Sequence, residues 1–105
     1  MNNQRRNRIK KCIKLLDYSA QANPIDIGIV QVLRKEIDGI LNDEEESFEC
    51  IPDNLKDSMK GEDSQDAISC MYDAIDNLEK ALKETDQSKM FNLIYEAVDN
   101  LEDIY

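Results

Sequence analysis

YDAIDNLEKAL (Tyr72–Leu82) and YEAVDNLEDIY (Tyr95–Tyr105) are near copies of one another, displaced by 23 residues. Within each copy the apolar residues recur at spacings of three and four, which indicates an amphipathic helix. On one continuous helix, at about 100° per residue, this displacement would rotate the second copy by roughly 140°. No single neighbour would then cover both apolar faces. The spacing predicts a break near residues 84–88 and two separate helices, with one kinked helix as the alternative.

The same helical periodicity runs through the rest of the 105-residue chain, and no segment alternates with the period of a strand. Alanines such as Ala67 and Ala74 widen the apolar faces, and a wide face needs more than one neighbour. We therefore expect a single all-α domain, either an antiparallel four-helix bundle or a long kinked helical hairpin, with a dimer as a further option. The expected helices span residues 3–22, 24–49, 63–84 and 87–104, with a turn at 50–62.

Capping residues indicate where the second and third helices begin. Asn23 can cap the second helix, with Pro24 in its first turn. Asp63 or Ser64 can start the third helix, after Gly61 has closed the preceding turn in a left-handed conformation.

The fourth helix can be capped by Asp86 or Ser88. This break and the one at Asn23–Pro24 lie at similar distances on either side of the turn at 50–62. An antiparallel fold would therefore place the two breaks opposite each other.

The net charge of −10 conceals a strong asymmetry along the chain. Residues 1–14 hold six basic residues and no acid, whereas 21 acidic residues accompany five lysines from Glu36 onward. The basic segment either folds back against Asp99, Glu102 and Asp103 or serves as an arm for nucleic acid or another anionic surface. It contains no aromatic residue that would stack on bases. The candidate anion-binding residues are Arg5, Arg6, Arg8, Lys10 and Lys11.

The residue types that catalysis and metal binding need are poorly represented. The chain has no His, no Gly-rich phosphate loop and no base placed to activate a Ser or Cys. DEEESFE and GEDSQDAIS lack the glycine and the ligand spacing of a calcium loop, and the three cysteines do not make a zinc site. We therefore predict a non-enzymatic protein with no catalytic residue, metal or cofactor. The odd cysteine count, the lack of a signal peptide and the short apolar runs favour a soluble cytoplasmic protein.

Acidic residues gather around the turn at 50–62, at one end of the expected fold. They either keep the protein soluble or imitate the phosphates of DNA and bind a basic groove, with fast, salt-sensitive association. Phe48, Ile51 and Leu55 either cap the core or anchor such a partner. The candidate partner-binding acids are Asp43, Glu44, Glu45, Glu46, Glu49, Asp53, Asp57, Glu62, Asp63, Asp66, Asp73 and Asp76.

DEEESFECIPDNLKDSMKGE (43–62), followed by AIDNLEKAL (74–82), resembles a known group of proteins. The pattern is an acidic run, an aromatic residue, a Pro-containing turn with a Leu, a Gly-Glu pair and an Ala-Ile-Asp-x-Leu-Glu repeat. It is similar to small acidic helical proteins of unknown function that phages and mobile elements of Gram-positive bacteria encode. The resemblance covers about residues 40–82 and implies an accessory protein of a mobile element, without a defined chemistry.

We predict a phage or mobile-element protein of the bacterial cytoplasm that acts by protein–protein contact. It would inhibit a basic nucleic-acid-binding host or phage protein through its acidic surface, as an anti-CRISPR protein does, for example. The first alternative is a helical self-association module in which the apolar faces form a homodimer. The second is a nucleic-acid accessory protein that uses the basic N-terminal segment.

Overall fold

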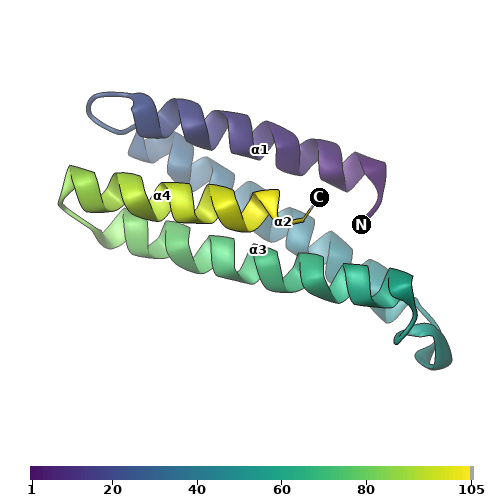
Figure 1. Cartoon of the computed structure of the whole chain (residues 1–105). Coiled ribbons are helices and arrows are strands. Elements are labelled where there is room, and N and C mark those ends of the chain that lie inside the picture. The colour runs from purple at the N-terminus through teal and green to yellow at the C-terminus, as the bar shows by residue number, and fades with distance from the viewer. Residues whose placement is uncertain (105) are drawn as a thin grey trace.

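The computed structural model describes residues 1–104. Helices account for most of this part of the chain, which contains no strand (Figure 1). The elements are α1 (Asn3–Gln21), α2 (Ile27–Glu49), the short 3₁₀ helix η1 (Asp53–Leu55), α3 (Met59–Lys83) and α4 (Gln87–Glu102).

The four α-helices form an antiparallel bundle, which confirms the expected all-α fold. Each helix packs against two others, in the cyclic order α1, α2, α3, α4. The α1–α2 and α3–α4 connections lie at one end of the bundle and η1 lies at the other (Figure 1). The molecule measures 49 × 20 × 18 Å. None of the helices in residues 1–104 is long and apolar enough to cross a membrane.

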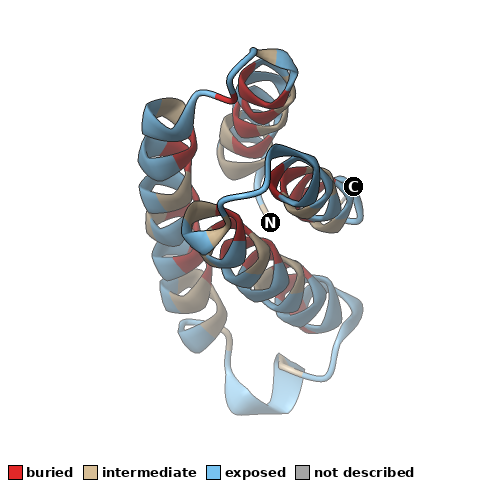
Figure 2. Ribbon diagram, turned by 90° about the vertical axis from the view of Figure 1, so that its left-hand side faces the viewer, coloured by how far each residue is buried: buried red, intermediate tan, exposed pale blue. Residues whose placement is uncertain are grey.

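The core is made by the apolar stripes that the sequence predicts. Buried residues lie on the sides of all four helices that face the bundle axis (Figure 2). The alanines that widen the stripes are buried as well, so neighbouring helices approach closely at these positions. The largest apolar side chains with no more than 2 % exposure are Ile9, Leu16, Ile37, Ile40, Leu41, Met71, Leu78, Ile94 and Leu101.

The repeat occupies two adjacent helices, α3 and α4, and the predicted break between its copies is confirmed. Asp86 caps α4, its carboxylate accepting from the N–H groups of Ser88 and Lys89. Asn77 and Asn100 hold equivalent places in the two copies, and Asn77 Nδ2 donates to Asn100 Oδ1 over 2.8 Å. The repeat is thus one packing pattern used on two helices that face each other.

The predicted start of α2 is wrong by three residues. The helix begins at Ile27, and Asp26 rather than Asn23 caps it by accepting from the Ile29 N–H over 3.1 Å. Pro24 lies outside the helix, after a cis peptide bond. Ile25, in the non-helical connection between α1 and α2, is buried in the core, so this connection packs against the bundle instead of continuing as a helix. The Ile25 N–H donates to Gln87 Oε1, so the two breaks lie side by side as expected.

The predicted start of α3 is also wrong, because the helix begins at Met59, four residues before Asp63. Ser58 caps it and accepts from the Gly61 N–H over 3.4 Å. Gly61 is a buried helical residue, and no glycine in residues 1–104 has a positive φ, so the expected left-handed turn is absent there. A Cβ at Gly61 would lie 1.9 Å from the carbonyl oxygen of Lys56. Close backbone approach therefore explains this glycine.

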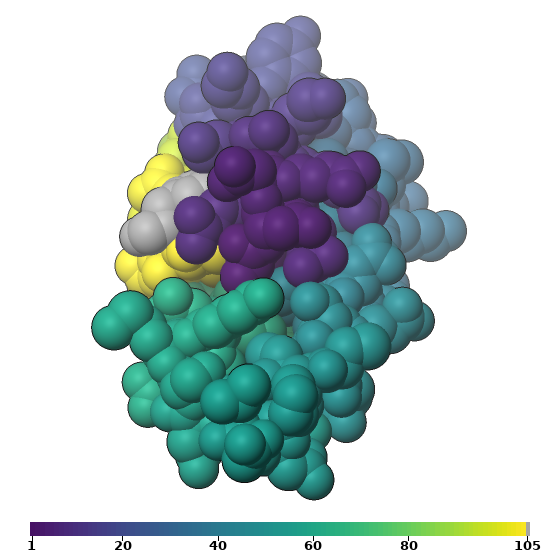
Figure 3. All heavy atoms as spheres, turned by 90° about the vertical axis from the view of Figure 1, so that its right-hand side faces the viewer, coloured from purple at the N-terminus to yellow at the C-terminus, as the bar shows by residue number. Residues whose placement is uncertain are grey.

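The end of the bundle that carries η1 projects beyond the start of α1. Residue 44 is the last buried position of α2, and no residue from 45 to 60 is buried. We call residues 45–63 the tip and the rest of the bundle the body. Figure 3 looks onto this end, where the tip (teal) projects beside the start of α1 (purple).

Candidate protein-binding groove

A groove of about 890 Å³ runs between the end of α2 and the first part of α3, from the tip into the adjoining part of the body. The residues that line it recur on each helix at spacings of three and four, as one side of a helix requires. They are Glu45, Glu46, Phe48, Glu49 and Cys50 from the α2 side, and Gln65, Ile68, Ser69, Tyr72 and Asp73 from α3.

The groove combines apolar walls with an acidic rim. Phe48 and Ile68 are half-buried in it, and the Tyr72 side chain is 53 % exposed. None of the described residues that line it is Lys or Arg. The acids that line it are Glu45, Glu46, Glu49 and Asp73. The groove therefore offers apolar contact and negative charge together, which suits a cationic partner with apolar side chains.

Tyr72 connects the two walls of the groove. Its hydroxyl donates to Glu45 Oε1 over 3.1 Å, and this hydrogen bond is the main reason why the pKa of Tyr72 is raised. The phenol thus stays neutral and holds α2 and α3 in register. Beside the groove, the Lys56 ammonium lies 5.3 Å from the centroid of the Phe48 ring. It also pairs with Glu49 and Asp53, at 3.6 and 3.2 Å.

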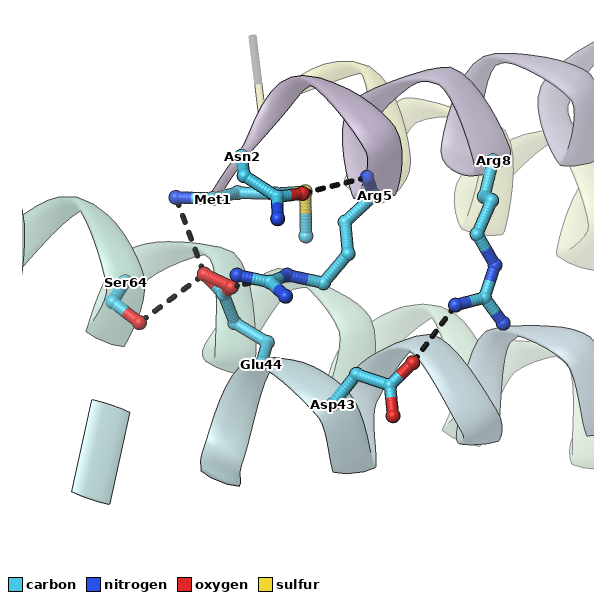
Figure 4. A network of polar contacts seen from close by, with 7 residues as sticks. All are labelled: Met1, Asn2, Arg5, Arg8, Asp43, Glu44 and Ser64. Atoms are coloured by element: carbon cyan, nitrogen blue, oxygen red, sulfur yellow. Dashed lines mark hydrogen bonds and ion pairs between the residues drawn. The ribbon is translucent and has the colours of Figure 1, made fainter. Parts of the chain in front are cut away.

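The prediction that all twelve acids form an exposed surface is wrong for Glu44, because this residue is 1 % exposed. Figure 4 shows it enclosed between the start of α1 and α3. Its Oε2 accepts from Arg5 Nε over 3.0 Å, and its Oε1 accepts from the Ser64 hydroxyl over 3.2 Å. The α-ammonium of Met1 lies 3.2 Å from the same Oε1. Internal partners thus satisfy this carboxylate, and a partner protein cannot reach it.

The basic N-terminal segment is a packed helix in this structure. Arg8 contacts Glu36 at 2.9 Å and Asp43 at 2.8 Å, and the hydrogen bond to Asp43 is the main cause of its raised pKa. The ion pairs of Arg5 and Arg8 thus go to α2, whereas the sequence led us to expect acids of the C-terminal helix. Since α1 and α2 are adjacent and antiparallel, the start of α1 meets the end of α2. Arg6 lines a hollow with Asp103, as expected.

The structure does not bring the other predicted acids onto one face. Asp63 and Asp66 line the hollow that contains Arg6, on a different side of α3 from the groove. Asp76 pairs with Lys80 at 3.0 Å, and Asp57 and Glu62 are exposed. Four of the twelve predicted acids thus gather at the groove. The others are spread over several sides of the molecule.

The three apolar residues predicted as an anchor also separate. Phe48 lines the groove, whereas Ile51 lines a separate hollow near the start of α1, beside Glu44. Leu55 is 49 % exposed on η1. Phe48 alone therefore retains a place in the candidate site. The groove residues that sequence reasoning missed are Cys50 after α2 and Gln65, Ile68, Ser69 and Tyr72 on α3. The four on α3 are spaced by three, one and three, so they form a second stripe on that helix, beside the stripe that packs into the core.

Two of the cysteines are in environments that suppress thiolate formation. Burial raises the pKa of Cys12 to about 12, and burial followed by nearby acids raises the pKa of Cys70. Cys50 is exposed in the groove. Within residues 1–104, no group of three or more Cys, Asp or Glu side chains is placed to hold a metal ion.

The fold and the groove together define a small all-α four-helix bundle with an acidic, partly apolar cleft. Comparisons with protein-family models, curated proteins and solved structures find no match for this chain. The resemblance to small acidic proteins of phages and mobile elements therefore stays a prediction.

Proposed function

We propose that this protein is a non-enzymatic binding protein whose groove takes a basic segment of a nucleic-acid-binding partner. The observation that carries the proposal is the lining of the groove, with four carboxylates around Phe48, Ile68 and Tyr72 and no Lys or Arg among its described residues. Such a cleft has apolar area to bury and negative charge to neutralise.

A basic partner suits the groove for two physical reasons. Like charges gathered in one cleft create a negative potential, which attracts a cationic segment over a distance and accelerates its binding. The rings of Phe48 and Tyr72 can also receive a guanidinium or ammonium group on their faces. Lys56 already lies over Phe48 in this way.

A partner that normally binds nucleic acid carries the required basic surface. Occupation of that surface by the groove would exclude phosphates, and the protein would then act as an inhibitor. In its most specific form, the proposal is a phage or mobile-element protein of the bacterial cytoplasm that inhibits a host nuclease, for example as an anti-CRISPR protein.

The test compares partner capture from bacterial lysate by three forms of the chain. The groove variant is Glu46→Lys/Asp73→Lys, and the matched control is Glu96→Lys/Asp99→Lys, which makes the same charge change on exposed positions of α4. Identification is by mass spectrometry. We expect the wild type and the control to capture one basic nucleic-acid-binding protein, and the groove variant to fail to capture it. High salt and added DNA should each release the captured protein.

Two results would contradict the proposal. One is capture of the same proteins by the groove variant and the wild type. The other is a captured partner that carries no basic nucleic-acid-binding surface.

A further inference from the structure

The groove has a counterpart of opposite charge further along the same two helices. A second hollow, of about 600 Å³, also lies between α2 and α3, in the body of the bundle. Its lining consists of Gln31, Arg34, Lys35, Glu79, Leu82 and Lys83.

Both hollows open on one side of the molecule, which we call the outer seam. On α2, its positions are 31, 35, 38, 42, 45 and 49, and on α3 they are 65, 69, 72, 76, 79 and 83. Both series alternate spacings of four and three, which keeps a row of residues on one side of a helix. Two bridges between the helices cross this seam, Tyr72 to Glu45 and Arg34 to Glu79.

The two halves of the outer seam carry opposite charge. The tip half has four carboxylates and no Lys or Arg among the described residues that line its hollow. The body half has three cations and one carboxylate. Arg34 is already paired with Glu79 at 2.6 Å, whereas Lys35 and Lys83 are exposed. The seam is therefore complementary in charge to a reversed copy of itself.

We propose that two copies of this chain pair through their outer seams, antiparallel, with the tip half of each on the body half of the other. A two-fold axis perpendicular to α2 and α3 that crosses near Ile40 and Ile75 gives this arrangement. These residues lie between the two bridges on both helices. A parallel arrangement would instead place the four carboxylates of one groove on the same four of the other, which like-charge repulsion opposes.

The register that this axis imposes matches unlike groups. Glu45 and Lys35 are each five residues from Ile40, so Glu45 of one copy faces Lys35 of the other. Asp38 and Asn42 are each two residues from the axis, so a carboxylate faces an amide that can donate to it.

The apolar residues of α3 match in the same register. Ile68 and Leu82 are each seven residues from Ile75 and both are half-buried in the single chain. Pairing would bury them against each other and cover the exposed ring of Tyr72.

Self-pairing would regulate the groove, because the second copy occupies the place proposed for the basic partner. A dilute protein would present the groove, and a concentrated protein would conceal it. This competition rests on the proposed function, whereas the self-pairing rests on the seam alone.

The experiment measures self-association by sedimentation over a concentration series at low and high salt. The variant Lys35→Glu makes two carboxylates face each other across the seam, and Glu45→Lys makes two ammonium groups do so. We expect each variant to weaken the dimer by about tenfold, because two surface pairs change from attraction to repulsion. An equimolar mixture of the two variants should dimerise again, since one of its two symmetry-related contacts regains an acid–base pair of reversed sign and the other keeps the original pair.

The controls are Lys89→Glu and Glu96→Lys, exposed positions on α4, which should dimerise like the wild type. Circular dichroism checks that each variant is folded. A wild type that stays monomeric at low salt overturns the self-pairing, and so does a mixture that associates no better than its components. Partner capture separates the two proposals: Lys35→Glu should still capture the basic partner, and the Glu46→Lys/Asp73→Lys variant should not. A dimer without any captured partner contradicts the proposed function alone.

Discussion

The body and the tip of this bundle use the same two helices, α2 and α3, and bury them to very different degrees. In the body, Ile37, Ile40 and Leu78 are fully buried because α1 and α4 complete the enclosure. At the tip, Phe48 is only half-buried, since no further helix covers that end. Ile68, in the adjoining part of α3, is half-buried because it faces the groove and not the core. The number of neighbours thus decides whether an apolar residue becomes core or remains available to a partner, and the candidate site follows from this difference.

Glu44 marks the boundary between the two regions, and its removal is expected to have the largest effect. In Glu44→Ala the guanidinium of Arg5 and the hydroxyl of Ser64 lose their acceptor at a buried position. Breaking a buried charge pair in this way costs about 3–5 kcal/mol in the free energy of unfolding. Urea denaturation measures the loss.

The matched control is the neighbouring residue Asp43, whose ion pair with Arg8 is half exposed. Solvent screening limits such a pair to less than about 1 kcal/mol, so Asp43→Ala should change the stability little. Equal losses in the two variants would mean that Glu44 does not hold the boundary together.

Gly61→Ala should affect the tip more than the body. The new Cβ would lie 1.9 Å from the backbone carbonyl oxygen of Lys56, which cannot move away as a flexible side chain would. We expect a loss of about 3 kcal/mol. Hydrogen exchange should show it as lost protection in η1 and the first turn of α3, while the middle of α2 stays protected.

Gly39 supplies the contrast for this prediction. It lies in the body, where the nearest atom to an added Cβ is Arg8 Nη2 at 3.8 Å. Gly39→Ala should therefore stabilise α2 by about 0.5–1 kcal/mol, through its better helix propensity. A neutral Gly61→Ala would falsify the close approach at the tip.

The smallest of the three effects is a pH dependence that arises in the body. Cys12 is 2 % exposed there, and burial, followed by the charge of Glu36, raises the pKa of its thiol from 9.0 to about 12. Between these values the folded chain keeps the proton and the unfolded chain releases it. The stabilisation is therefore complete below about pH 9 and is lost as the pH rises toward 12. We expect a loss of about 2 kcal/mol between about pH 9 and 10.5.

Urea denaturation at a series of pH values tests this slope. Cys12→Ala should reduce the slope, whatever its own effect on stability, and Cys50→Ala, which removes an exposed thiol at the tip, is the matched control. Cys70, Tyr72 and Tyr95 also have raised pKa values and contribute to the slope at alkaline pH in every variant. A slope that is the same with and without Cys12 would contradict the buried thiol as its source.

Much of the body could be predicted from the sequence, because local spacing carries the information. Apolar residues at three and four identify a helix, and the displacement of the repeat requires a break that Asp86 then caps. The start of α3 could not be predicted in this way. Ser58, Asp63 and Ser64 are all acceptable caps, and only the packing of Gly61 on Lys56 distinguishes them.

Only part of the lining of the candidate groove could be predicted from the sequence. Acidic residues around residues 50–62 are plain in the sequence, and four of the predicted acids do line the groove. The partners of Glu44 lie 20 residues or more away in sequence, so no local pattern shows that this acid is buried. The apolar side of the groove was missed for a related reason. Ile68 stands at helical spacing from Met71 and Ile75, so the sequence assigns it to the core until the neighbours of α3 are known.

By itself, the sequence determined the helical class, the break between the two copies of the repeat and the uneven charge of the chain. These depend on residue type and on spacings within a few turns, which physical rules convert directly into structure. Only the tertiary structure decided which acids are exposed, which apolar residues remain open to solvent and that the two halves of the outer seam carry opposite charge. Burial and charge pairing depend on residues distant in the chain, and folding alone brings these together.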